Sequence, residues 1–134
     1  MSELRDQICE LIHNSIENKQ YNEEIVFDIP VKTIKRLKGI LHFNMNGYKC
    51  TISSHSIRHI KRGHPKDLSY ICEIPIIIQD FDRVEKSITK DKKTGATLVS
   101  LEFYKKYSNG IVKLVKLKVH IKKRLELKTL FIPE

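Results

Sequence analysis

The sequence predicts an α+β fold in which N-terminal helices are followed by a twisted antiparallel β-sheet meander. Two periodicities support this prediction. Near the N-terminus, apolar residues recur at helical spacing, at Leu4, Ile8, Leu11, Ile12 and Ile16. From residue 84 onward, apolar and polar residues instead alternate with the period of a strand, in runs separated by turn-forming residues. The 134 residues suit one domain and no long linker divides them, so we expect residues 1–134 to form a single domain.

The first half of the chain predicts mostly helices. The expected elements, in order, are a helix at 3–18, a strand within 21–28, a helix after Pro30, a hairpin of 40–45 with 48–53, and helices at 54–62 and 66–73. The hairpin rests on Asn46-Gly47, a pair that strongly favours a tight turn between strands. Gly63 is expected to end the helix at 54–62, and the helix at 66–73 is expected to stop before Pro75.

The second half predicts four strands, at 84–89, 97–107, 111–121 and 125–132, joined in part by the turn-forming segments DKKTG and SNG. In the third strand, alternation places one set of side chains on one face, namely Val112, Leu114, Lys116, Lys118 and His120. We expect the opposite face, with Val115, Leu117, Val119 and Ile121, to pack on the core. Lys118 and His120 would then line a groove that follows a phosphate backbone, and Lys116 would be an exposed lysine.

The composition excludes several classes of protein. Hydrophobic residues make up 40% and charged residues 31%, which is typical of a globular chain and not of a disordered one. No apolar run approaches the roughly 20 residues that a bilayer span needs, and the acidic N-terminus does not resemble a signal peptide. The three cysteines are widely spaced without a CxxC motif. We therefore expect three reduced thiols, a cytoplasmic protein and no association with a membrane.

Charge is unevenly distributed along the chain. Residues 1–30 contain two Lys or Arg against seven Asp or Glu, whereas residues 31–134 contain 23 against nine, a net charge of +14. Such a basic region attracts polyanions such as nucleic acid. A basic surface that serves only solubility is the simpler alternative. The acidic N-terminal segment is expected either to pack as a helix or to cover part of the basic region.

The stretch SHSIRHIKRGHP, residues 54–65, concentrates histidines and cations on one helix. At 100° per residue, His55, His59 and Arg62 fall within about 60° of one another, with Arg58 beside them. Ile57 and Ile60 point to the opposite side, where they would anchor the helix. Imidazoles can give or take protons near neutral pH, and guanidiniums hold phosphate oxygens, so this face suits work on a phosphodiester.

Two simpler interpretations of this helix remain open. A basic helix face is commonly just a solvated surface. The spacing of His55 and His59 also suits a pair of zinc ligands. However, serine follows His55 where the HExxH motif has glutamate, and neither a third ligand nor a pairing of His64 with Cys72 is better supported. We therefore expect no metal ion and no cofactor.

The segment from residue 52 to residue 84 resembles the phage- and toxin-associated nuclease domains of the barnase–EndoU–colicin–RelE group. The shared pattern is HI-x-x-x-H on a helix, found here from His59 to His64, then the apolar run Ile76–Ile78 and a turn at Asp80–Val84. Phe81 stands where proline is common. The resemblance continues to Lys128-Thr129 on the last strand. It divides the chain into a nuclease-like core at 50–132 and an N-terminal extension of helix and hairpin at 1–49.

The resemblance implies a metal-independent endoribonuclease, often a toxin that cleaves tRNA or other RNA by attack of the ribose 2′-OH, leaving a 2′,3′-cyclic phosphate. The expected catalytic residues are His59, His55, Arg62, His64 and Thr129. The expected RNA-binding residues are Arg58, Lys118, His120 and Lys128. Because neighbours on a strand point to opposite faces, Lys128 and Thr129 are not expected to face the groove together.

Two further expectations concern partners and alternatives. A ribonuclease would damage its own host, so we expect an acidic immunity protein or antitoxin that covers the basic groove. The protein would act in the cytoplasm, either where it is made or after delivery into a target cell. The alternative function is a catalytically inactive domain that binds nucleic acid or protein through the same groove. Cleavage of RNA in excess EDTA would separate the two functions.

Overall fold

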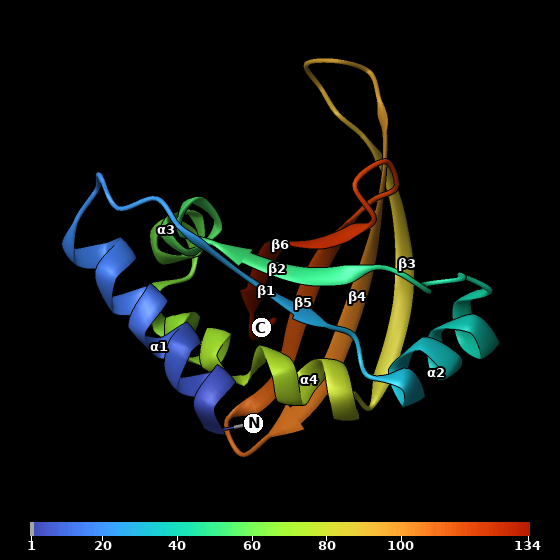
Figure 1. The fold of residues 1–134 in the computed structure, drawn as a ribbon, viewed down its shortest axis with the longest axis horizontal. Helices are drawn as coiled ribbons and strands as arrows, with labels where there is room; N and C mark the ends of the chain where they lie inside the picture. Colours follow the sequence, from blue (N-terminus) through green and yellow to red (C-terminus); the bar gives the residue numbers. More distant parts are fainter. Residues whose placement is uncertain (1) are drawn as a thin grey trace.

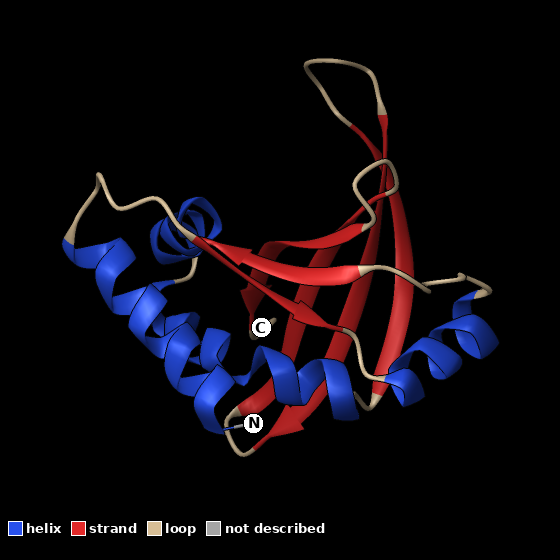
Figure 2. Cartoon of the chain, in the orientation of Figure 1, coloured by secondary structure: helices blue, strands red, loops and turns tan. Residues whose placement is uncertain are grey.

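A computed structural model describes residues 2–134 and shows one sheet with helices packed mainly against one of its faces (Figures 1 and 2). The elements are α1 (Ser2–Glu17), β1 (Glu24–Asp28), α2 (Val31–Leu41), β2 (Lys49–Ser53), α3 (Ser54–Gly63), the 3₁₀ helix η1 (Pro65–Glu73), α4 (Ile74–Asp80), β3 (Arg83–Lys90), β4 (Thr97–Tyr107), β5 (Gly110–Val119) and β6 (Arg124–Phe131). The predicted α+β class is confirmed.

The sheet is mostly antiparallel and has six strands in the described chain, in the order β1-β2-β6-β5-β4-β3. Strands β3 to β6 form the predicted meander, in which each strand pairs antiparallel with the next. Strand β2 joins the other side of β6 in parallel, and β1 pairs antiparallel with β2. The N-terminal part of the chain therefore contributes to the same sheet as the meander.

The hairpin predicted around Asn46-Gly47 is wrong. The helix expected after Pro30 is confirmed as α2, but it continues to Leu41 and takes up the start of the expected strand at 40–45. Thr33, Leu37 and Leu41 lie on one side of that helix and are buried. Gly47, with φ of +82°, occupies a turn that leads into β2, and the partners of β2 are β1 and β6. The turn signal is real, but the chain before it packs as a helix.

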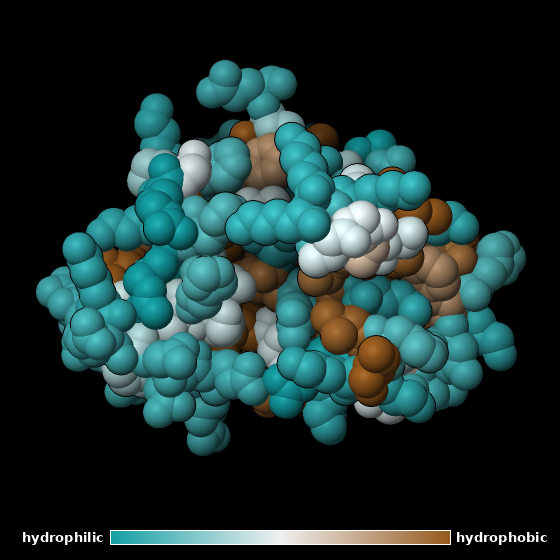
Figure 3. Space-filling view, turned by 90° about the horizontal axis from the view of Figure 1, so that it is seen from above, coloured by the Kyte–Doolittle hydropathy of each residue, from teal (hydrophilic) through white to brown (hydrophobic). Residues whose placement is uncertain are grey.

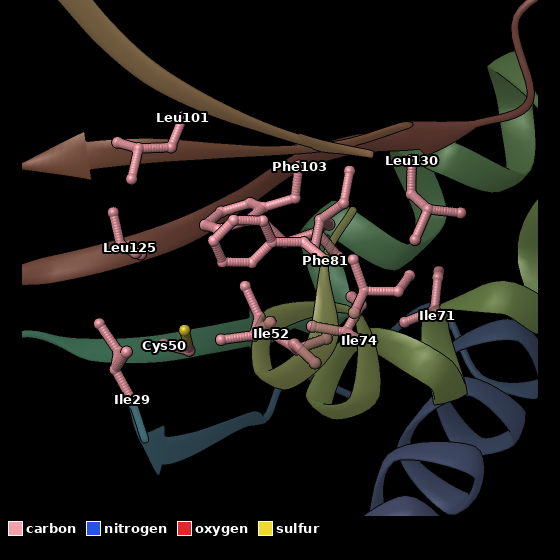
Figure 4. Close-up of a cluster of buried hydrophobic side chains, with 14 of the residues drawn as sticks. Ile29, Cys50, Ile52, Ile71, Ile74, Phe81, Leu101, Phe103, Leu125 and Leu130 are labelled. Carbon is pink, nitrogen blue, oxygen red and sulfur yellow. The ribbon is translucent and has the colours of Figure 1, made fainter. Parts of the chain in front are cut away.

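Helix α4 is not among the elements that the sequence predicts. Pro75 suggests the end of a helix, yet it lies at the start of α4, where its missing N–H costs nothing. This helix packs with η1 against the sheet, and its residues Ile74, Ile77 and Ile78 are buried. Figure 4 shows this core, with Phe81 and Phe103 in edge contact at 5.3 Å between ring centroids.

The prediction of three free thiols is also wrong. Cys9 on α1 and Cys72 on η1 form a disulfide, with their Cα atoms 5.5 Å apart. Arg5 and Glu73 join the same two elements by an ion pair of 2.8 Å. Cys50 is free and lies in the core, where burial raises the pKa of its thiol. No helix in residues 2–134 is both long enough and apolar enough to cross a membrane.

The two faces of β5 are the reverse of those predicted. Val112, Leu114 and Lys116 point into the core, and Lys116 is fully buried instead of exposed. Its Nζ donates a hydrogen bond of 2.7 Å to the Thr51 carbonyl on β2. Burial lowers the pKa of Lys116 from 10.5 to about 8. Alternation identifies residues that share a face, but it does not say which face is inside.

Candidate functional site

Helix α3 is held by contacts at its start and along its apolar side. The Ser53 hydroxyl accepts a hydrogen bond of 3.2 Å from the Ser56 N–H, which caps the first turn. Ile57 and Ile60 are completely buried, as the helical wheel predicts. His55 and His59 are exposed, so the helix presents its imidazoles away from the core.

The two histidines lie together in a hollow of about 230 Å³ between α3 and the strands β5 and β6. The residues that line it are His55, Ser56, His59, Leu117, Glu126, Leu127 and Lys128. We call this set the histidine pocket. The Ser56 hydroxyl donates a hydrogen bond of 2.7 Å to the Leu127 carbonyl, so α3 is fixed directly beside β6.

The chain reaches this arrangement because β2 runs into α3 without a linker. Strand β2 pairs with β6 from Lys49 to Thr51, and α3 begins at Ser54. Past that point β6 has no neighbouring strand on that side, and α3 and η1 contact it instead. The histidine side of α3 therefore lies beside β6 just beyond its pairing with β2.

A β-bulge in β6 brings Lys128 and Thr129 to the same side of the sheet. Leu127 pairs with Lys116 and Thr129 pairs with Val115, so Lys128 is an extra residue between two successive pairs. Leu127 and Leu130 are buried on the core side, whereas Lys128 is exposed and Thr129 is half-buried. The expectation that these neighbours must face opposite ways is wrong, because the bulge interrupts the alternation.

The two arginines of α3 line its other flank. Arg58, Lys61 and Arg62 form a separate hollow with Ile16 near the end of α1 and Lys19 in the turn after it. The Arg58 guanidinium donates hydrogen bonds to the carbonyls of Ser15, at 3.1 Å, and Tyr21, at 2.9 Å, and so holds α1 and the following loop. Arg62 therefore lines a different hollow from His55 and His59, and the prediction that the three share one cleft is wrong.

Lys118 and His120 do not face the histidine pocket either. The Lys118 ammonium lies 5.3 Å from the ring centroid of Phe43 and 5.5 Å from that of Tyr48. The Tyr48 hydroxyl is 3.2 Å from His120 Nδ1. These contacts place both residues near the start of β2, on the core side of β5. The predicted groove of Lys118 and His120 beside the histidines is therefore not formed.

His64 lies in neither the histidine pocket nor the hollow of the two arginines. Its ring stacks on Phe131, with 4.5 Å between centroids and an angle of 11° between the planes. It lines a different hollow, formed by residues 63–67 and 131–134. Of the predicted site residues, the structure thus brings together His55, His59 and Lys128, with Thr129 beside Lys128 on the same strand.

Glu126 is a pocket residue that the sequence interpretation missed. It precedes Lys128 by two positions on β6 and lines the histidine pocket with it. Alternation in LELK places Glu126 and Lys128 on one face, but nothing in the sequence joins that face to α3. Within residues 2–134, no group of three or more His, Cys, Asp and Glu side chains is arranged to hold a metal ion.

The histidine pocket therefore combines two imidazoles, an ammonium and a carboxylate at an exposed edge. Imidazoles transfer protons, and an ammonium stabilises negative charge that develops on a nearby oxygen. No curated protein and no solved structure is significantly similar to the chain. One family model matches residues 28–133, which include every element from α2 to β6. The chain belongs to the phage-Barnase-EndoU-ColicinE5/D-RelE like nuclease3 family.

Proposed function

We propose that this nuclease is an endoribonuclease that cleaves RNA by attack of a ribose 2′-OH on the adjacent phosphate. The bond from the 2′-oxygen to phosphorus forms and the bond from phosphorus to the 5′-oxygen breaks. A base removes the 2′-OH proton and an acid protonates the leaving oxygen. The products are a 2′,3′-cyclic phosphate and a 5′-OH end. This proton transfer requires no bound metal ion.

The observation that supports the proposal most is the pairing of His55 with His59 in one pocket beside Lys128. Two imidazoles provide a base and an acid, and the Lys128 ammonium neutralises charge on the phosphorane. Thr129, on the same side of the bulge, would donate its hydroxyl to a phosphate oxygen. The family supplies nuclease activity, and the pocket suggests this route to it.

The experiment compares wild-type protein with His59→Ala on total RNA in excess EDTA. Loss of a proton-transfer group typically lowers the rate by about 100- to 10,000-fold. RNA affinity should change little, since one side chain contributes only modestly to binding of a polyanion. His13→Ala, at an exposed position on α1, is the matched control and should cleave normally.

Two results would contradict the proposal. If His59→Ala cleaves RNA at the wild-type rate, the histidine pocket is not the catalytic site, and His64 becomes the residue to test. If wild-type protein retains RNA in a salt-sensitive way but leaves it intact, the chain is a catalytically inactive binding domain. Mapping the fragment ends for cyclic phosphate separates 2′-OH attack from other routes of cleavage.

The same proposal includes a toxin role in the cytoplasm and an acidic protein partner. Residues 31–134 carry a net charge of +14, and complementary charge speeds capture of a partner. An immunity protein or antitoxin would cover the histidine pocket and stop cleavage. Co-purification from the native host at low salt should return such a protein, and the partner proposal fails if no acidic protein is recovered.

A further inference from the structure

A second hollow lies on the flank of α3 next to α1, across the exposed ridge of the helix from the histidine pocket. It has a volume of about 580 Å³ and is lined by Ile16, Lys19, Arg58, Lys61 and Arg62. We call it the basic hollow. Four of its five lining residues are cations and none is acidic. Its volume falls within the range of about 300–1,000 Å³ that is usual for ligand sites.

The cations of the basic hollow are not all explained by the fold. Arg58 holds α1 through two backbone carbonyls. Lys19, Lys61 and Arg62, by contrast, are exposed and take part in none of the ion pairs found in residues 2–134. Like charges three and four positions apart on a helix destabilise it. Such a cluster is expected where an anion neutralises it.

The basic hollow and the histidine pocket share one exposed ridge of α3. At 100° per residue, Arg62 projects about 20° to one side of His55, whereas His59 projects about 40° to the other. A chain of phosphates that crosses this ridge would contact the histidines on the β6 side and the cations on the α1 side. Hydrophilic residues dominate the surface seen from above, with smaller hydrophobic patches between them (Figure 3).

We propose that the basic hollow binds the phosphodiester backbone of single-stranded RNA next to the bond that is cleaved. This inference rests on the proposed ribonuclease function. Binding would depend on charge and not on sequence, because lysine and arginine side chains that bind phosphates carry no sequence information. Ile16 and Lys19 precede residue 28, where the family match begins, so α1 and the turn after it add part of this site to the family fold.

The test measures affinity for a fully 2′-O-methylated RNA decamer, which has no 2′-OH and so cannot be cleaved by the proposed route. Lys19→Gln/Lys61→Gln should bind about 10-fold more weakly than wild type by fluorescence anisotropy. The slope of log affinity against log salt should become shallower by about 1.4, since each phosphate that the variant no longer neutralises accounts for about 0.7. Lys35→Gln/Lys38→Gln on the exposed side of α2 is the control for net charge and should bind nearly as wild type.

A second measurement compares cleavage of an unmodified decamer with cleavage of a dinucleotide. The dinucleotide is too short to reach the basic hollow, so Lys19→Gln/Lys61→Gln should lower kcat/KM about 10-fold for the decamer and less than twofold for the dinucleotide. Because both lysines are exposed, thermal melting should confirm that the variant is folded. If the wild type cleaves neither RNA, the ribonuclease proposal fails, and the anisotropy result still reports on the basic hollow.

Three results would overturn the inference. The two double variants could show equal reductions in affinity, which would indicate a general effect of net charge. Lys19→Gln/Lys61→Gln could bind the decamer as wild type, which would show that no phosphate occupies the basic hollow. Unchanged affinity of that variant for both the decamer and the dinucleotide would likewise overturn the inference.

Discussion

Lys116→Met removes the only lysine found buried in the core of the described chain and replaces it with an apolar side chain of similar length. The lysine is fully buried between Leu101 and Leu127, its pairing partners on β4 and β6. Its single hydrogen bond, of 2.7 Å, goes to the Thr51 carbonyl. Buried charge without a carboxylate partner is costly, so the fold disfavours the protonated form.

The magnitude follows from the pKa of Lys116, which burial lowers from 10.5 to about 8. At 1.36 kcal/mol per pKa unit, protonating this residue at pH 7 costs the folded state about 3 kcal/mol. Loss of the hydrogen bond to Thr51 offsets about 1–3 kcal/mol of that cost in the methionine variant. At pH 7 the variant is therefore expected to be as stable as wild type, or more stable by up to about 2 kcal/mol.

The dependence on pH is the sharper test. Because folding lowers the pKa of Lys116, the unfolded chain binds more protons than the folded chain between about pH 8 and pH 10.5. Wild type should gain stability from this residue as the pH rises, whereas the methionine variant has nothing to titrate there. The difference in unfolding free energy between the two should shift toward wild type by about 2.5 kcal/mol from pH 7 to pH 10.

Urea denaturation followed by circular dichroism at pH 7, 8, 9 and 10 measures this difference. Lys38→Met removes the same charge from an exposed position on α2 and controls for the change in net charge. A difference between Lys116→Met and wild type that stays constant over this range refutes the reasoning, because the charge of Lys116 would then not destabilise the fold. A variant less stable than wild type by more than about 3 kcal/mol at pH 7 would instead show that the hydrogen bond to Thr51 dominates.

Two further predictions concern the disulfide and the histidine pair. Reduction, or Cys9→Ser, should lower the unfolding free energy by about 4 kcal/mol, because the disulfide closes a loop with a sequence separation of 63. Denaturation with and without reductant measures this difference. Equal stability under the two conditions would argue against the crosslink. RNA cleavage should show a bell-shaped dependence of kcat/KM on pH if His55 and His59 divide the acid and base roles. A profile with a single inflection in wild type would mean that only one of them transfers a proton.

Local periodicity correctly predicted those helices and strands whose bounds are set by their own apolar spacing. Helix α1 and strand β4 begin and end within about one residue of the expected limits, and α3 begins at the expected residue. The failures come from competition between signals. Asn46-Gly47 marks a turn, but the apolar spacing of Leu37 and Leu41 takes the preceding residues into a helix. Pro75 can end one helix or begin the next, and its surroundings decide which.

The same distinction explains the site. The orientation of His55 and His59 follows from the helical wheel, because Ile57 and Ile60 must be buried wherever α3 packs. The positions of Arg62 and Lys118 depend on which element covers each side, and the sequence does not contain that information locally. In β5 both faces carry apolar residues, so the buried face is chosen by the helices that pack on it. Lys116 is the residue for which this choice matters most.

The bulge in β6 allows two neighbouring polar residues, Lys128 and Thr129, to lie on the side of the sheet that carries the histidine pocket. With regular alternation, only one of Lys128 and Thr129 could face α3, and the other would have to enter the core among the leucines of β6. One extra residue gives both access to the outer side while Leu127 and Leu130 stay buried. Because the Ser56 hydroxyl binds the Leu127 carbonyl just before the bulge, the same short segment both fixes α3 and directs the polar pair. The catalytic geometry that we propose thus depends on the backbone of β6 as much as on the histidines. Deleting Lys128 should restore regular alternation with Thr129 still opposite Val115, and RNA cleavage should fall because the pocket loses its ammonium.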